Sequence, residues 1–178
     1  MDRRELLKNA CGLGVCGCAA GLLGVPGKAG ADETADADQR LAFARYQIAK
    51  LVGFVAGATT PETCAAILEN TGRECARLNQ LAARYKGDAD GYFAAIKAAW
   101  GTDATWDKEK GVITVTVPEG PCGCPLVDAA RTPALWCNCS VGYGKEAFGT
   151  VFGRPVEASL KESKLTGSAR CVFEVRLS

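Results

Sequence analysis

The chain has 178 residues, a formal net charge of +1 and no histidine. The lack of histidine excludes Ser-His and Cys-His catalysis and every imidazole metal site. The near-neutral charge and the absence of a basic stripe with interleaved aromatic residues exclude an electrostatic site for nucleic acid. Because Met1 is the only methionine, a Met-ligated copper or haem iron is excluded as well.

The first 31 residues have the composition of an export signal. Arg3 and Arg4 precede an apolar run, rich in glycine and alanine, over residues 10–25. The small residues Ala29-Gly30-Ala31 then form an A-x-A cleavage signal. Because the apolar run is short and rich in glycine, it fits an export signal better than a membrane-spanning helix.

The stretch D-R-R-E-L-L-K around the two arginines resembles the signal of the twin-arginine translocation pathway. The resemblance implies recognition by the twin-arginine export machinery, export of a folded protein, a periplasmic or secreted location and no stable membrane insertion after cleavage. An ordinary secretory signal and a lipid anchor through V-C-G-C at residues 15–18 are the alternatives. Cleavage after Ala31 leaves residues 32–178, which is the length of one domain.

Hydrophobic periodicity predicts helices in the first half of this domain. Apolar residues recur at helical spacing over residues 39–56, and Thr60-Pro61 supplies a hydroxyl cap and a proline for the start of a second helix. We expect this second helix to continue to about Tyr85, with Gly72 as a point where it breaks or bends. A third helix is expected over the apolar stretch that ends at Trp100.

The second half has the pattern of a small sheet. After a turn over residues 106–111, the β-branched run at 112–117 predicts a strand. Two further strands are expected over residues 154–163 and 169–177, preceded by a helix that Ser140 caps. Together these elements predict an α+β fold, with N-terminal helices followed by a small antiparallel sheet and one helix packed on it.

Cysteine is the most informative residue type in the chain. Three of the ten cysteines lie in the predicted signal, which leaves seven in the domain. Because seven is odd, at least one thiol is free, metal-bound or paired with another molecule. A protein that folds in the cytoplasm before export folds where thiols stay reduced, which favours metal binding over disulfides.

Four of the seven cysteines form a doubled Cys-x-Cys pattern, Cys122/Cys124 and Cys137/Cys139, in a predicted loop or short extended segment. Residues two apart in an extended chain point the same way, so each pair can offer two sulfurs to one ion. The pattern therefore indicates a tetrathiolate site for Zn²⁺, with a four-cysteine iron–sulfur cluster as the next alternative. Two disulfides with no cofactor, and catalytic or redox thiols, are the remaining alternatives.

Other candidates lie near this segment or outside it. Trp136 and Tyr143 are candidates for the wall of a small-ligand pocket, with ordinary packing as the alternative. Cys171, on a predicted strand, is expected to be a small buried hydrophobe or a fifth sulfur. Cys64 and Cys75 share a face of the second helix, about 16 Å apart, and are expected in the core. The candidate acid or base groups near the loop are Glu119, Asp128 and Glu146.

Residues 136–177 resemble part of two related families of small domains. The resemblance rests on Cys139, Gly142-Tyr143, Pro155-Val156 and the closing Gly…Cys-x-Phe hairpin that contains Cys171. The families are the 4-vinyl reductase (V4R) domains and the L-2-amino-thiazoline-4-carboxylic acid hydrolases. The resemblance implies an α+β domain that binds a small ligand and uses cysteines for metal binding. For the hydrolase branch it implies opening of a thiazoline ring.

Three functions follow from these observations and stay open. The preferred one is an exported domain that binds a metal through Cys122, Cys124, Cys137 and Cys139 and a small molecule beside it. The second is a metal-dependent hydrolase of the thiazoline type, in which a Zn²⁺ with an open position activates water at a C–N or C–S bond. The third is a disulfide-stapled domain that acts through a partner protein.

Overall fold

The structure is a computed structural model that describes residues 29–177, with side chains from residue 34 onward. The chain divides into two compact units, residues 1–38 and residues 39–178. Helix α2 begins at Ala29 and covers the predicted cleavage point, whereas the predicted twin-arginine motif lies outside the described residues. Within the described part of the chain, no helix combines the length and apolar character needed to cross a membrane.

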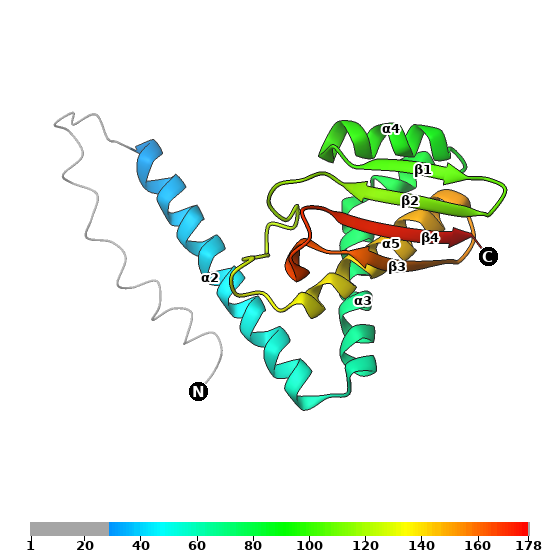
Figure 1. Ribbon diagram of the computed structural model, residues 1–178. Helices are drawn as coiled ribbons and strands as arrows, with labels where there is room; N and C mark the ends of the chain where they lie inside the picture. Colours follow the sequence, from blue (N-terminus) through cyan, green and yellow to red (C-terminus); the bar gives the residue numbers. More distant parts are fainter. Residues whose placement is uncertain (1–28, 178) are drawn as a thin grey trace, which may run out of the picture. The chain divides into compact units, whose positions relative to one another are not determined.

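The fold class is α+β, as the sequence predicts (Figure 1). The α-helices of the described part are α2 (Ala29–Ala58), α3 (Pro61–Asn79), α4 (Ala89–Trp100) and α5 (Cys137–Phe152). The short 3-10 turns are η1 (Ala82–Tyr85), η2 (Ala134–Trp136) and η3 (Lys164–Thr166). The strands are β1 (Asp103–Asp107), β2 (Val112–Val117), β3 (Val156–Glu162) and β4 (Cys171–Leu177), in the antiparallel order β1-β2-β4-β3.

Helices cover one face of the sheet, while the opposite face is polar. Ile113 of β2 and Val175 of β4 are paired in register and fully buried, and they pack against residues of α4 and α5. The next residues on the strands point the other way, so Thr114 is exposed and Glu174 pairs with Lys161. We call the apolar layer the sheet core. Its buried members are Ala76, Ala82, Tyr92, Ile96, Ile113, Val115, Ala147, Phe148, Val151, Val156 and Val175.

Two glycines allow helices α3 and α5 to approach very closely. A Cβ atom added at Gly72 of α3 would lie 1.7 Å from the carbonyl oxygen of Cys139. One added at Gly142 of α5 would lie 1.9 Å from the carbonyl oxygen of Glu69. Both distances are far below van der Waals contact, so only glycine fits at either position. Gly72 therefore does not interrupt the helix, as the sequence suggested, because α3 is continuous from Pro61 to Asn79.

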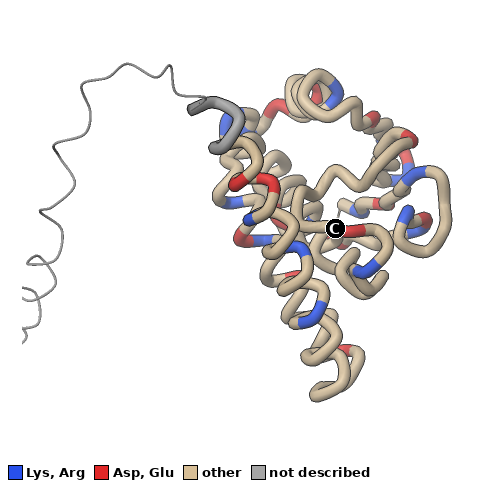
Figure 2. Tube along the Cα trace, turned by 90° about the vertical axis from the view of Figure 1, so that its left-hand side faces the viewer, with Lys and Arg blue, Asp and Glu red and all other residues tan. Residues whose placement is uncertain are grey.

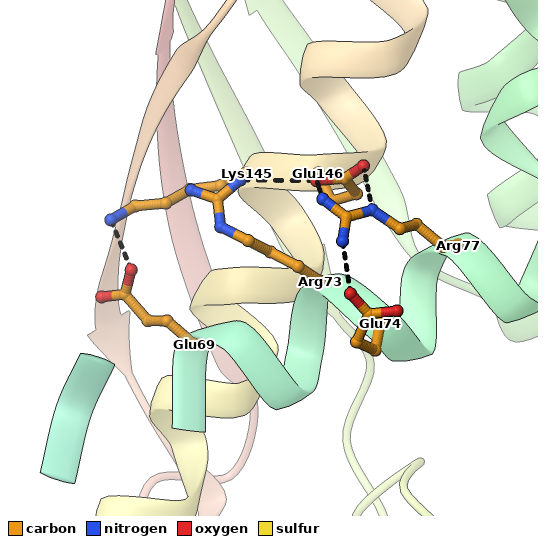
Figure 3. A network of polar contacts seen from close by, with 6 residues as sticks. All are labelled: Glu69, Arg73, Glu74, Arg77, Lys145 and Glu146. Atoms are coloured by element: carbon orange, nitrogen blue, oxygen red, sulfur yellow. Dashed lines mark hydrogen bonds and ion pairs between the residues drawn. The ribbon is translucent and has the colours of Figure 1, made fainter. Parts of the chain in front are cut away.

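Ion pairs flank the same crossing (Figure 3). Lys145 Nζ of α5 lies 2.7 Å from a carboxylate oxygen of Glu69 on α3, and Lys145 is only 16% exposed. Glu146 accepts from Arg77 at 2.9 Å and lies 3.5 Å from Arg73. Since these pairs sit on neighbouring residues of α5, they fix the rotation of this helix against α3 and so the direction in which its first turn faces.

Local sequence signals explain most helix boundaries. Thr60 caps α3 because its side chain accepts a backbone N–H from the first turn, as predicted. Gly153 ends α5 with a φ of 66°, a left-handed conformation that favours glycine. The predicted start of α5 was wrong, because the 3-10 turn η2 runs directly into the helix at Cys137. Ser140 consequently lies inside α5 and does not cap it.

The strand β1 was missed by the sequence interpretation. Residues 106–111 were expected to form a turn, but Trp106 pairs in register with Ile113 and extends the sheet by one strand. The turn is restricted to the residues after Asp107 and ends at Gly111, whose φ of 64° supplies the left-handed position of the hairpin. Pairing with β2 therefore overrides the polar character of the segment.

A second cluster of apolar residues lies away from the sheet core. Its buried members are Val52, Cys64, Leu68, Val127 and Trp136, and we call it the second cluster. They come from α2, α3, η2 and the loop that follows β2. Arg45 Nε of α2 also donates to the carbonyl oxygen of Pro125, at 2.7 Å. The part of α2 after residue 38 is thus tied to the loop that carries Cys122 and Cys124.

Figure 2 marks the charged residues along the Cα trace. Positions of Lys and Arg lie among positions of Asp and Glu along the helices and the loops. This mixed distribution agrees with the small net charge of the chain.

Candidate functional site

Six of the seven described cysteines lie near one another, and neighbouring thiols contribute to the raised pKa values of Cys122, Cys137 and Cys139. They are Cys75, Cys122, Cys124, Cys137, Cys139 and Cys171, and we call them the thiol cluster. Four segments supply them: α3, the loop after β2, the first turn of α5 and the first residue of β4. The fold thus adds two cysteines to the doubled Cys-x-Cys pattern on which the sequence interpretation rested.

One side of the thiol cluster is organised around the turn η3. Cys137 Sγ lies 3.1 Å from the hydroxyl oxygen of Ser163, a side chain that is 2% exposed. The backbone N–H of Lys164 points at Cys171 Sγ, 3.5 Å away. Cys122 belongs to the same side, because it lies near both Cys171 and Cys137. The structure therefore places Cys171 beside Cys122 and Cys137.

The other side is formed where α3 crosses α5. Cys139 and Cys124 pack against the second cluster, and Cys75 of α3 lies near Cys139. The close approach at Gly72, three residues before Cys75, accounts for this proximity. Cys75 itself is exposed, so the expectation that it lies in the core was wrong, whereas Cys64 is fully buried as expected.

The geometry of the second Cys-x-Cys pair differs from the expected one. Cys137 and Cys139 lie in the first turn of α5, not in an extended segment. In a helix, residues two apart are separated by about 200° around the axis, so their side chains point to nearly opposite sides. Accordingly Cys137 meets Ser163 whereas Cys139 meets the second cluster. In this conformation the two sulfurs of the pair cannot bind one ion together, and each thiol lies on a different side of the thiol cluster.

Burial keeps these thiols protonated. It raises the pKa of Cys139 to about 12, with neighbouring thiols as a smaller contribution. Burial also raises the pKa of Cys137 and of Cys122. The hydrogen bond between Cys137 and Ser163 opposes the shift of Cys137, and a backbone hydrogen bond at Cys124 and the nearby cation of Lys164 oppose that of Cys122. A thiol is reactive as its thiolate, so these cysteines are not activated nucleophiles at neutral pH.

The seven described cysteines are all free thiols. Among the described residues, no group of three or more His, Cys, Asp or Glu side chains is arranged so that it could hold a metal ion. The donor set itself, with at least four sulfurs, suits Zn²⁺ or an iron–sulfur cluster. The predicted ligands Cys122, Cys124, Cys137 and Cys139 therefore lie in one region, but not as a closed tetrahedral site.

The two aromatic candidates lie in different places. Trp136 is buried in the second cluster. Tyr143 packs against the sheet core and forms an edge contact with Trp100, with ring centroids 6.3 Å apart. Burial raises the pKa of the Tyr143 hydroxyl to about 12. The two side chains thus belong to separate clusters and do not face one another across a common pocket.

The three candidate carboxylates have structural partners or are exposed. Asp128 builds its own turn by accepting from the N–H of Ala130 at 3.0 Å. Glu146 is held by the arginines of α3, and Glu119 is exposed. The sequence interpretation missed Ser163 and Lys164, which touch the thiols. The signal that marks them is the S-K-L-T-G turn between two predicted strands, where a serine side chain commonly organises the backbone.

Comparison with known proteins adds a family and a fold. Residues 76–178 match the model of a family of unknown function, DUF6144, and the chain belongs to that family. No curated protein matches the chain. Among solved structures, the fold is similar to a trafficking protein particle complex subunit 3 from Naegleria fowleri, solved covalently bound to palmitic acid. The two share 19% identity with a TM-score of 0.52, over 79% of this chain and 96% of that chain, which is a likeness of fold.

Proposed function

We propose that this member of the DUF6144 family is an exported domain that binds a soft metal through its thiol cluster. The observation that carries the proposal is the convergence of sulfurs from four separate chain segments at the first turn of α5. Zn²⁺ is the preferred ion because thiolates suit it and no imidazole is needed, and an iron–sulfur cluster is the alternative. The V4R resemblance of residues 136–177 points to the same use of cysteines.

Metal binding requires a movement of the loop that follows β2. A Zn–S bond of about 2.3 Å places the sulfurs of a tetrahedral site about 3.8 Å apart. Cys122 and Cys124 lie on a loop without regular structure. The side chains of Lys164 and Arg45 donate hydrogen bonds to the carbonyl oxygens of Pro121 and Pro125 in this loop. Packing of Cys122 and Cys124 against the second cluster also holds this segment, so a shift toward α5 has to break that packing as well as the two hydrogen bonds.

Cys171 is a further candidate ligand on the same side as Cys122 and Cys137, whereas Cys139 faces the other side. Cys171 lies near both Cys122 and Cys137, and it stands at the start of a strand that is fixed in the middle of the sheet. A metal lowers the pKa of a coordinating thiol and releases its proton, so binding reverses the effect of burial on these residues. Uptake of the ion is therefore expected to release protons at neutral pH.

The test is metal analysis combined with free-thiol titration on reduced protein, reconstituted with Zn²⁺ and then desalted. We expect one ion per chain and a matching loss of titratable thiols. Cys137→Ser and Cys171→Ser should lose the ion, whereas Cys64→Ala, outside the thiol cluster, should retain it. Absence of metal together with two mapped disulfides would refute the proposal and favour a disulfide-stapled domain. If the metal-loaded protein hydrolyses a cyclic thioimidate and the Ser variants do not, the domain also has the hydrolase activity that the resemblance implies.

A further inference from the structure

A groove outside the thiol cluster lies between α2 and the loop before α5. It has a volume of about 590 Å³ and is lined by Tyr46, Ala49, Lys50, Gly53, Phe54 and Arg131. This volume is in the range of about 300–1,000 Å³ that small-molecule sites occupy. All of these residues belong to the unit that starts at residue 39.

The two walls of the groove are firmly attached to one another. Val52, on the inner side of α2, is 3% exposed and packs with Val127 in the second cluster. The loop wall is a compact turn in which the N–H of Thr132 donates to the carbonyl oxygen of Asp128 at 2.7 Å. The N–H of Asp128 donates in return to the hydroxyl of Thr132 at 3.0 Å. Arg131 therefore projects from a wall that is already in place without a ligand.

The lining combines apolar surface with positive charge. Phe54 and Tyr46 are 71% and 44% exposed, so they present aromatic surface to a ligand. Lys50 and Arg131 supply two cations, and Asp128, which lies 3.4 Å from Arg131, supplies one opposing carboxylate. Lys50 Nζ lies 5.6 Å from the centre of the Tyr46 ring, so its charge stays near the aromatic wall. The complement of this surface is an anion with an apolar body.

Gly53 keeps the groove open. A Cβ atom added at this position would meet nothing within 4 Å. Glycine inside a helix costs about 1 kcal/mol relative to alanine, and here no close contact with the rest of the protein requires it. A larger side chain at Gly53 would fill the space between the aromatic residues and the cations.

We propose that this groove binds a small aromatic or branched-aliphatic carboxylate. The carboxylate lies between Lys50 and Arg131, and the apolar body lies on Phe54 across Gly53. The proposal names the class of the small ligand in the proposed function, but it depends on no residue of the thiol cluster. Metal content and ligand binding are measured separately, so either proposal can fail while the other stands.

The test uses phenylacetate as the probe and phenylacetamide as its neutral counterpart, in ¹H–¹⁵N NMR titrations of the full chain. We expect shifts of the amide signals of α2 and of residues 128–132 with phenylacetate, and at least tenfold weaker binding of phenylacetamide. Gly53→Leu should abolish the shifts. Its matched control is Gly57→Leu, which lies one turn later on the same helix, also with nothing within 4 Å of an added Cβ.

The charge variants Lys50→Gln and Arg131→Gln should each weaken binding about tenfold, which corresponds to one charge-assisted hydrogen bond. Equal binding of acid and amide, or unchanged binding in Gly53→Leu, overturns the proposal. Sedimentation of the same variants tests whether a second copy of the chain occupies the groove. If Gly53→Leu and Gly57→Leu both dissociate a dimer, a second copy covers this face and the groove is not a ligand site.

Discussion

The close crossing of α3 and α5 predicts a large effect of a single methyl group at Gly72. In Gly72→Ala, the added methyl group would lie 1.7 Å from the carbonyl oxygen of Cys139 and 2.8 Å from the backbone nitrogen of Tyr143. An ordinary contact begins at 3.4 Å, so the two helices must separate by about 1.7 Å. The obstacle is the backbone of a helix, which cannot rotate out of the way as a side chain can.

Two opposing contributions set the size of the effect. Alanine is favoured over glycine in a helix by about 1 kcal/mol. Overpacking of a tight interior costs about 1–3 kcal/mol and sometimes more. Because the added methyl group of Gly72→Ala meets main-chain atoms, we expect a cost at the upper end of this range. We therefore expect Gly72→Ala to lower the free energy of unfolding by about 2 kcal/mol. Gly53→Ala, in the open part of α2, should instead raise it by about 0.5–1 kcal/mol.

Urea unfolding followed by far-ultraviolet circular dichroism measures both changes. The two substitutions are chemically identical and both lie inside helices, so the difference between them isolates the effect of the crossing. If Gly72→Ala is as stabilising as Gly53→Ala, the helices are not in contact at this point and the placement of Cys139 beside α3 is wrong. A rescue of Gly72→Ala by addition of Zn²⁺ would show instead that the metal tolerates a wider crossing.

Three further predictions concern the pH dependence, an ion pair and export. The pKa of Cys139 is about 12 in the folded state and near 8.5 in the unfolded state, so above about pH 8.5 only the unfolded state loses its proton. The free energy of unfolding of the metal-free protein, measured in urea, should therefore fall as the pH rises above about 8.5, and Cys139→Ala should lessen this fall. Lys145→Met leaves the half-buried Glu69 unpaired and should cost about 1–3 kcal/mol in urea unfolding, whereas Lys145→Met combined with Glu69→Leu should recover part of the loss. Replacement of Arg3 and Arg4 by lysine should abolish export of a reporter fused to residues 1–40, and an unaffected reporter would favour the ordinary secretory route.

Much of the fold could be predicted because its signals are local. The β-branched run at 112–117 and the Thr60 cap are determined by a few neighbouring residues, and both elements were placed correctly. The strand β1 could not be found this way, because Trp106 becomes extended by pairing with Ile113 and not through its own preference. Gly72 was misjudged for a related reason, since its role depends on a helix that starts 65 residues later.

The site was predictable in its residue types but not in its geometry. The spacing of the cysteines marked the segments that carry four members of the thiol cluster, and the fold brings Cys171 to them from the last strand. No local signal shows that Cys137 begins a helix, because the preceding turn at Pro133 determines that start. Once Cys137 and Cys139 are helical they point apart, and a motif defined for an extended chain no longer describes the donors.

The location of the thiol cluster bears on whether the domain needs its metal in order to fold. The buried members of the sheet core, such as Tyr92, Ile113 and Phe148, include no thiol. Cys122, Cys124 and Cys139 instead pack against the second cluster, where protonated thiols behave as small hydrophobes. A domain of this kind differs from a zinc finger, which unfolds without its ion. We therefore expect chelation to free residues 118–125, the part of the loop that carries Cys122 and Cys124, while the sheet stays folded. Hydrogen exchange of the chelated protein should show faster exchange within residues 118–125 and unchanged protection in β2 and β4.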